Sequence, residues 1–115
     1  MIKRNLFNSM IKSVFVKASL ATLVIVCFAA PTTHKISQKG KAFSQVSITV
    51  NKGDSISFMN DDSVVHNVYS TSQGNSFNLK TQTPGTANSV TFNSSGMAEV
   101  RCAIHPTMRL VVNVK

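Results

Sequence analysis

The stretch RCAIHPTM, residues 101–108, contains the residues best suited to metal chemistry in this sequence. Cys102, His105 and Met108 follow one another at steps of three residues. Their thiolate, imidazole and thioether groups are the soft and borderline donors that bind transition metals. Three such donors within seven residues are unusual for a surface loop or a core strand, so the spacing predicts a site for a soft metal ion.

A fourth donor lies upstream of this stretch. His66 precedes Cys102 by 36 residues and lies near the start of the run 65–69. Two imidazoles and one thiolate in a plane, with a weak thioether on the axis, form the ligand set of a blue-copper electron-transfer site. The residue types therefore predict a one-electron carrier whose ligands are His66, Cys102, His105 and Met108.

The chemistry explains why these donors are needed together. Cu(I) and Cu(II) prefer different geometries, and a rigid site that suits neither fully changes oxidation state with little rearrangement. Asn67 follows the first histidine directly. We expect its amide to reach across to the loop that carries the other ligands and to hold it, as residues outside the ligand set commonly do in metal sites.

Other site chemistries need residues that the sequence lacks. Haem c attachment requires Cys-x-x-Cys-His, and a binuclear copper centre requires a second cysteine in the loop. Structural zinc prefers more than one cysteine or a third histidine. A Cys-His hydrolase needs a base and oxyanion donors around its cysteine, and nothing supports those roles, so no catalytic residue is predicted. The pair Asp61–Asp62 is interpreted as a solvated turn, and Asp54 is given no role.

The elements expected to position the donors are short β-strands. Polar and apolar residues alternate over five segments, which are 46–50, 55–58, 89–92, 98–102 and 110–114. Turn residues at 51–54 and 93–96 separate them. The polar stretch 70–88 is expected to be a surface excursion with a short strand or turn around 77–79. This pattern predicts an all-β fold, a small antiparallel sandwich or barrel.

The first 30 residues differ from the rest and predict an export signal. Basic residues with no acidic neighbour precede the uncharged, apolar run 18–30, which ends in small residues. The signal is placed at 1–29, with cleavage after Ala29. The run is shorter than the roughly 20 apolar residues that span a bilayer, so an uncleaved membrane anchor is the alternative. Residues 30–42 are polar and basic and are interpreted as a tether or a ragged first strand, which puts the folded domain at 43–115.

Cysteine usage depends on what happens to this signal. Its removal leaves Cys102 as the one cysteine, which must be buried and inert, paired with another chain, reactive, or bound to metal. A lipid anchor on Cys27 is a further alternative, and a Cys27–Cys102 disulfide is possible only if the signal stays.

The charge pattern excludes one class of partner. The whole chain carries a formal charge of +8, and from Pro31 onward eight basic residues face four acidic ones. These positive charges are spread along the chain, and no aromatic residues are interleaved among them, which argues against nucleic-acid binding. A modest positive charge favours an acidic partner surface or an anionic membrane face.

The segments VHNVYS and GMAEVRCAIHPTMRLVVNV resemble the cupredoxins. The short Cys-x2-His-x2-Met loop is similar to that of amicyanin and the related plastocyanin-like proteins, and the resemblance covers roughly 43–115. It implies a Greek-key β-sandwich with one type 1 copper ion at His66, Cys102, His105 and Met108. It also implies one-electron transfer outside the cytoplasm, in the periplasm or an equivalent compartment. We expect the protein to be a monomer and not an enzyme.

The family resemblance also implies how electrons enter and leave. Its second histidine, here His105, projects through an apolar patch and acts as the electron port. The partners would be redox proteins of the cytochrome, dehydrogenase or oxidase type. Two other functions remain open from the sequence, namely a copper-delivery protein that uses the same pocket and a metal-free interaction domain.

Overall fold

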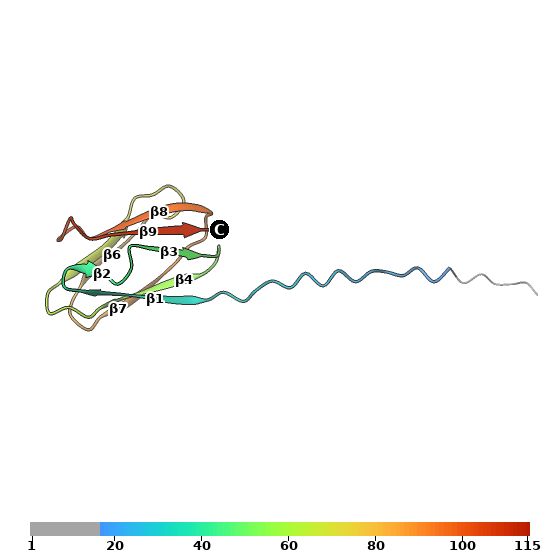
Figure 1. Ribbon diagram of the computed structural model, residues 1–115, viewed down its shortest axis with the longest axis horizontal. Coiled ribbons are helices and arrows are strands. Elements are labelled where there is room, and N and C mark those ends of the chain that lie inside the picture. The colour runs from blue at the N-terminus through green and yellow to red at the C-terminus, as the bar shows by residue number, and fades with distance from the viewer. Residues whose placement is uncertain (1–16) are drawn as a thin grey trace, which may run out of the picture.

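The computed structural model describes residues 17–115, and within them it contains nine β-strands and no helix. One sheet has the order β2-β1-β4-β7 and the other has the order β3-β9-β8-β5-β6, and the two form a sandwich (Figure 1). The all-β fold class predicted from the alternating pattern is confirmed. The strand bounds are β1 Thr33–Lys39, β2 Ala42–Phe43, β3 Ser47–Val50, β4 Ser55–Asn60, β5 His66–Ser70, β6 Phe77–Gln82, β7 Ala87–Thr91, β8 Gly96–Arg101 and β9 Arg109–Val114.

The connections between the sheets give the fold its topology. β1 pairs with β4 in parallel, and β3 pairs with β9 in parallel, whereas the other strand pairs are antiparallel. Each parallel pair joins strands that are not consecutive in the chain, so the chain crosses between sheets before it returns. The Greek-key sandwich therefore has its first and last long strands, β1 and β9, in opposite sheets.

The core lies between the sheets and follows the predicted alternation. On β4, Ile56 and Phe58 are fully buried, and on β9 Leu110 and Val112 are fully buried. Each such side chain contributes about 1.5–3 kcal/mol through the loss of apolar surface from water. Phe77 extends this core from the edge strand β6, with its ring centroid 6.2 Å from that of Phe58. The site is thus built on two closely packed sheets.

Two segments, for which a strand was only one of the alternatives, form longer strands than expected. Residues 33–39, inside the expected tether, form the well-paired strand β1, because Ile36 and Gln38 turn inward and are fully buried. Residues 77–82, inside the expected surface excursion, form the six-residue strand β6, whose Gln82 is also fully buried. Both strands bury polar side chains, which alternation of apolar residues does not detect.

A buried amide pair connects the two sheets. The Nε2 group of Gln38 on β1 donates to Oε1 of Gln82 on β6, at 2.7 Å. Gln82 Nε2 in turn donates to the backbone oxygen of Phe58 on β4 and to Oδ1 of Asn88 on β7. Buried polar groups are costly unless they are hydrogen-bonded. This pairing fixes how β1 lies against the rest of the sandwich.

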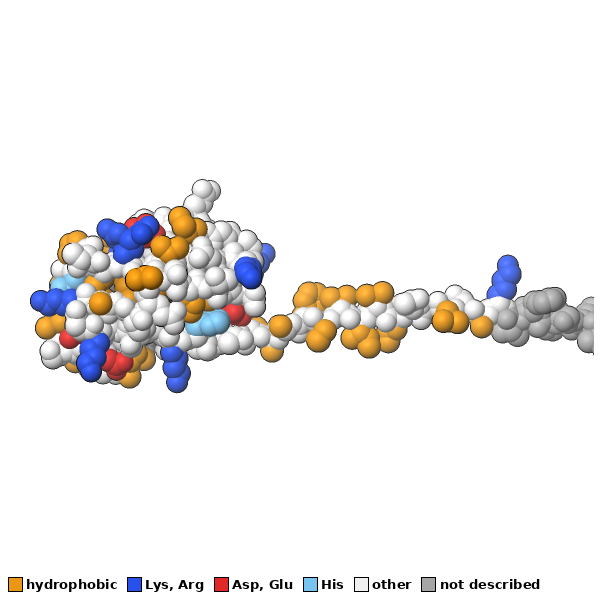
Figure 2. Space-filling model, in the orientation of Figure 1, with side chains coloured by type: hydrophobic (Ala, Val, Ile, Leu, Met, Phe, Trp, Pro, Cys, Tyr) orange, Lys and Arg blue, Asp and Glu red, His pale blue; other side chains and the backbone are white. Residues whose placement is uncertain are grey.

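Residues 17–32 precede the sandwich without forming a strand or helix, and they extend away from it (Figure 1). Their apolar side chains are exposed, for example Leu20 and Phe28 (Figure 2). In residues 17–115 no helix is long and apolar enough to cross a membrane. The rest of the predicted export signal, residues 1–16, lies outside the described residues. Cys27 is exposed and Cys102 is buried, and both are free thiols, so the proposed Cys27–Cys102 disulfide is not formed.

Candidate metal centre

The hairpin between β8 and β9 carries three of the four predicted ligands. The two strands pair up to Arg101 and Arg109, which lie opposite each other. Residues 102–108, here called the ligand loop, connect them at the end of the sandwich opposite the C-terminus (Figure 1). The backbone N–H of Met108 donates to the oxygen of His105 at 3.0 Å and closes the loop as a turn. The loop is therefore anchored by the most extensive hairpin of its sheet.

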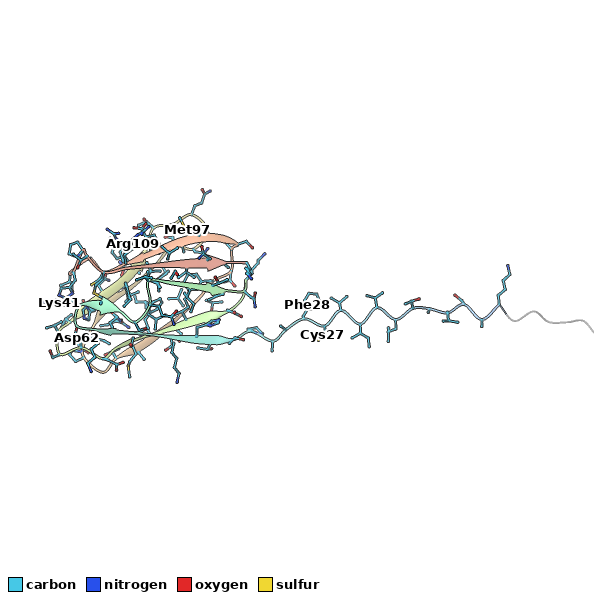
Figure 3. All side chains as sticks on the ribbon, in the orientation of Figure 1. Cys27, Phe28, Lys41, Asp62, Met97 and Arg109 are labelled. Atoms are coloured by element: carbon cyan, nitrogen blue, oxygen red, sulfur yellow. The ribbon has the colours of Figure 1, made fainter. Side chains whose placement is uncertain are left out.

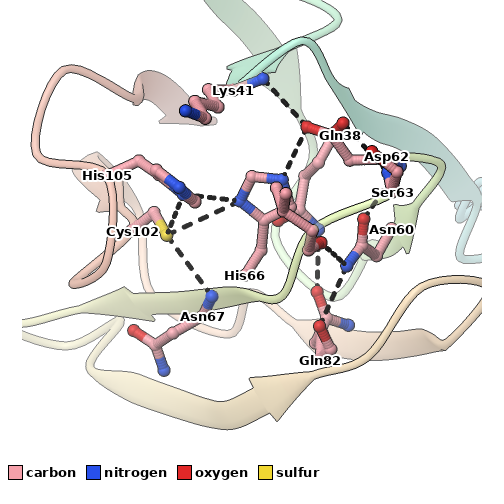
Figure 4. A network of polar contacts seen from close by, with 11 residues as sticks. Gln38, Lys41, Asn60, Asp62, Ser63, His66, Asn67, Gln82, Cys102 and His105 are labelled. Carbon is pink, nitrogen blue, oxygen red and sulfur yellow. Dashed lines mark hydrogen bonds and ion pairs between the residues drawn. The ribbon is translucent and has the colours of Figure 1, made fainter.

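Three predicted donors converge at one point (Figure 4). The ligand atoms of His66, Cys102 and His105 all lie within 4.8 Å of one another. Cys102 Sγ is 3.9 Å from His66 Nδ1 and 3.8 Å from His105 Nδ1, and the two Nδ1 atoms are 3.0 Å apart. His66 comes from the start of β5, which pairs with β8. Sheet pairing thus brings together residues that are 36 positions apart.

The fourth predicted donor, Met108, lies on the inner side of the ligand loop. It is 1% exposed and belongs to the same apolar core cluster as Cys102, which is also 1% exposed. His66 is fully buried, whereas His105 is partly exposed. Three of the four predicted ligands are therefore buried, and the imidazole of His105 is the one that is partly exposed.

The arrangement fits a soft transition-metal ion. Two imidazole nitrogens that face each other at 3.0 Å need a cation or proton between them. The sulfur beside them is a buried thiol, and a buried thiolate requires a compensating positive charge. Burial, followed by electrostatic interactions with His66 and Lys41, lowers the pKa of His105 below its usual value. That shift favours the neutral imidazole, which is the form that binds metal.

Asn67 connects the first ligand with the ligand loop. Its backbone N–H donates to Cys102 Sγ at 3.3 Å, and its side-chain oxygen accepts from the N–H of Ala103 at 3.3 Å. Its amide nitrogen donates to Asn78 Oδ1 and to the backbone oxygen of Lys80. Asn67 thereby holds the thiol through its backbone, and the ligand loop and the neighbouring strand β6 through its side chain.

Asp62 is a residue of the site that sequence reasoning missed. It was assigned to a solvated turn, but its side chain is only 13% exposed, and its Oδ2 lies 2.9 Å from His66 Nε2. The hydrogen bond from the Lys41 backbone, then that from His66, lowers the pKa of Asp62 to about 2. The signal in the sequence was its position four residues before His66. The spacing alone does not indicate a contact, because the contact depends on the turn before β5 folding back so that Asp62 reaches His66.

The surface around His105 is partly apolar with basic residues nearby. Ile104 is 50% exposed, and Ala103 and Pro106 are exposed on either side of the histidine. Figure 3 places Lys41 and Asp62 at the same end of the sandwich as the ligand loop. Arg109, which follows the loop, is paired with Glu99 on β8.

Comparison with known proteins gives matches to copper proteins. A family model described as copper binding proteins, plastocyanin/azurin family, matches residues 30–115, a range that includes β1. Methylamine utilization protein MauL of Methylorubrum extorquens is 40% identical over 63 residues, which are 54% of this chain and 55% of MauL. The chain therefore spans about half the length of this curated relative.

Two solved structures share the sandwich. A purple cupredoxin from Nitrosopumilus maritimus has a TM-score of 0.64 at 23% identity, with 71% of this chain and 99% of that chain covered. Amicyanin from Paracoccus versutus has a TM-score of 0.66 at 23% identity, with 72% and 81% covered. At these identities the two structures show a common fold.

Proposed function

Because the chain belongs to the plastocyanin/azurin family of copper-binding proteins, we propose that it carries single electrons between redox proteins through a type 1 copper site. The proposed ligands are His66, Cys102, His105 and Met108. The main observation in support is the convergence of two Nδ1 atoms and one Sγ within 4.8 Å. Copper supplies the one-electron chemistry by alternating between Cu(II) and Cu(I).

The protein's own residues make this exchange fast by resisting rearrangement. The buried positions of His66, Cys102 and Met108 exclude water from the donors. Asn67 restrains the thiol and the ligand loop at the same time. A site held in one geometry changes oxidation state with little movement of its ligands.

The partly exposed His105 is the proposed point of electron entry and exit. Its neighbours Ile104 and Pro106 offer apolar contact area, which lets a partner approach closely. With four protein donors, the site leaves no position open for a substrate, so we propose that the protein is not itself an enzyme. We further propose that it acts outside the cytoplasm, as a monomer, with cytochrome, dehydrogenase or oxidase partners.

Burial of the site argues against the alternative role in copper delivery. A delivery protein must pass its ion to ligands of an acceptor, which requires donors that the acceptor can reach. Here Cys102 and Met108 are each 1% exposed. Electron transfer needs only orbital contact at the surface, and His105 provides it.

The test is a titration of the full chain with Cu(II), followed by visible absorption. We expect an intense blue copper-thiolate band that saturates at one copper per chain, and a reversible one-electron wave in voltammetry. The variant Cys102→Ser should lose the band completely. Cys27→Ser is the matched control, because it removes the other, exposed thiol, and it should keep the band.

Two results would contradict the proposal in different ways. A colourless protein in which Cys102 still reacts with a thiol reagent would support a metal-free interaction domain. A blue protein without a reversible wave, which transfers its copper readily to a chelating acceptor, would support copper delivery.

A further inference from the structure

One carboxylate oxygen next to the metal centre accepts two hydrogen bonds from different parts of the fold (Figure 4). Oδ2 of Asp62 accepts the backbone N–H of Lys41 at 2.9 Å and lies 2.9 Å from Nε2 of His66. Oδ1 of the same carboxylate accepts the N–H of Ser63 at 3.0 Å. The side chain of Asp62 thus connects the β1–β2 turn with the first residue of β5.

The contact decides which nitrogen of His66 carries the proton. An ionised carboxylate only accepts hydrogen bonds, so Nε2 must be the donor, and Nδ1 keeps its lone pair. That Nδ1 is the atom facing Cys102 Sγ and His105 Nδ1. The carboxylate therefore selects the tautomer that presents a free nitrogen to the metal position.

Asp62 is itself held in place on one side by a buried side chain. Asn60, which is fully buried, accepts the N–H of Asp62 with Oδ1 at 2.9 Å. Its amide nitrogen donates to the backbone oxygens of Val64 and Gln82, each at 2.9 Å. The short loop between β4 and β5 is therefore rigid where it carries the carboxylate.

The turn on the other side is equally constrained. Gly40 and Lys41 have φ of 60° and 55°, the left-handed pair of a two-residue hairpin turn. This conformation is uncommon for a residue other than glycine. It aims the Lys41 N–H at Asp62, and the backbone N–H of Asp61 donates to the oxygen of Gln38 at 3.0 Å. β1 belongs to one sheet and β5 to the other, so the carboxylate links the two sheets at the metal centre.

We propose that Asp62 is a positioning residue of the metal centre, which fixes the tautomer and orientation of His66 by binding it to the β1–β2 turn. The inference rests on the proposed copper site. Its negative charge next to the ligand also stabilises Cu(II), the more positive state, relative to Cu(I). Histidine ligands whose second nitrogen is held by a carboxylate are more basic and more rigid.

The test compares Asp62→Asn with Asp61→Asn in the full chain. Both variants remove one negative charge, at adjacent positions. Asp61 is exposed, and the hydrogen bonds to His66 and to the Lys41 backbone described above are made by the side chain of Asp62. We expect Asp62→Asn to weaken Cu(II) binding by about 10–100-fold and to raise the reduction potential. Asp61→Asn should leave the affinity and the potential close to those of the wild type.

A second measurement reads the hydrogen bond directly, and its first part needs only the wild type. In the metal-free wild type, nitrogen NMR should show the proton of the neutral His66 ring on Nε2, and this proton should exchange slowly with water. In Asp62→Asn that proton should exchange faster, because its acceptor has lost its charge.

Three results are decisive. If Asp62→Asn and Asp61→Asn have the same affinity and potential, or if the wild-type His66 carries its proton on Nδ1, the positioning role is wrong. If the wild type itself forms no blue copper complex, the proposed function fails instead.

Discussion

Met108 differs from the other three proposed ligands in the weakness of the bond that a thioether forms with copper. An axial thioether adjusts the reduction potential of such a site, whereas the thiolate creates its colour. Since Met108 is 1% exposed and packed in the core, its replacement also tests how the core tolerates a change of shape.

We predict that Met108→Leu keeps the blue band and raises the reduction potential. Leucine places an apolar group where a donor stood, and apolar surroundings disfavour the more highly charged Cu(II). A swap between methionine and leucine costs less than about 1.5 kcal/mol of stability. Voltammetry and thermal unfolding check the two parts. An unchanged potential would remove Met108 from the proposed ligands.

The proposed ligands were predictable from the sequence, whereas their support was not. Cys102, His105 and Met108 lie close together in the chain, and their residue types identify the chemistry without any structure. Asp62 is an ordinary turn residue in the sequence. Its role depends on the β1–β2 turn, 21 residues away, which supplies the Lys41 N–H.

Among the strands, β1 depends on a contact at its N-terminal end that sequence reasoning also missed. Asp54, in the turn between β3 and β4, is 3% exposed. Its carboxylate accepts the N–H groups of Thr32 and Asn51, each at 2.9 Å, and contacts Nε2 of His34 at 3.0 Å. It therefore fixes the start of β1 against β4, its parallel neighbour.

This contact predicts a pH-dependent contribution to stability. The hydrogen bond from His34, followed by those from Thr32 and Asn51, lowers the pKa of Asp54 from 3.8 to about 2. A carboxyl group whose pKa is lowered by folding stabilises the folded state at pH values above its unfolded-state pKa. This contribution to stability is lost as the pH falls through the folded-state pKa. The wild type should therefore be more stable than Asp54→Asn at pH 6, and the difference should shrink between about pH 4 and pH 2. Chemical unfolding of metal-free protein at several pH values measures it, and a constant difference would contradict the assignment.

The strands that were predicted most directly are those that bury an alternating series of apolar residues. β4, β8 and β9 alternate cleanly, and their register is the one that buries the apolar face. β1 and β6 were predicted only as alternatives, a ragged first strand and a short strand or turn. Each places a glutamine in the core, and Gln38 Nε2 reaches its acceptor Gln82 Oε1 only across the two sheets. A buried amide pair of this kind depends on tertiary structure, which the pattern of a single strand does not contain.

For the whole molecule, the two ends of the sandwich have different roles. The ligand loop lies at one end, and the N-terminal segment and the C-terminus lie at the other (Figure 1). Lys41 lies at the ligand end (Figure 3), close enough for its charge to lower the pKa of His105. From Pro31 onward the chain has eight basic and four acidic residues, so we expect a redox partner that approaches His105 to meet a positive field.

This field predicts how the rate of electron transfer depends on salt. Oxidation of the Cu(I) protein by an anionic reagent such as ferricyanide should slow as ionic strength rises, because the Debye length falls to about 10 Å at 0.1 M salt. A cationic oxidant should show the opposite trend.

Lys41→Gln should slow the anionic reaction several-fold and flatten its salt dependence. Lys52→Gln is the matched control, since its backbone N–H donates to the oxygen of Lys115 at the opposite end, and it should change the rate little. Stopped-flow absorbance at the blue band measures all three proteins. Equal salt slopes for the two oxidants, or equal effects of the two substitutions, would show that electrons do not leave through the end that carries His105.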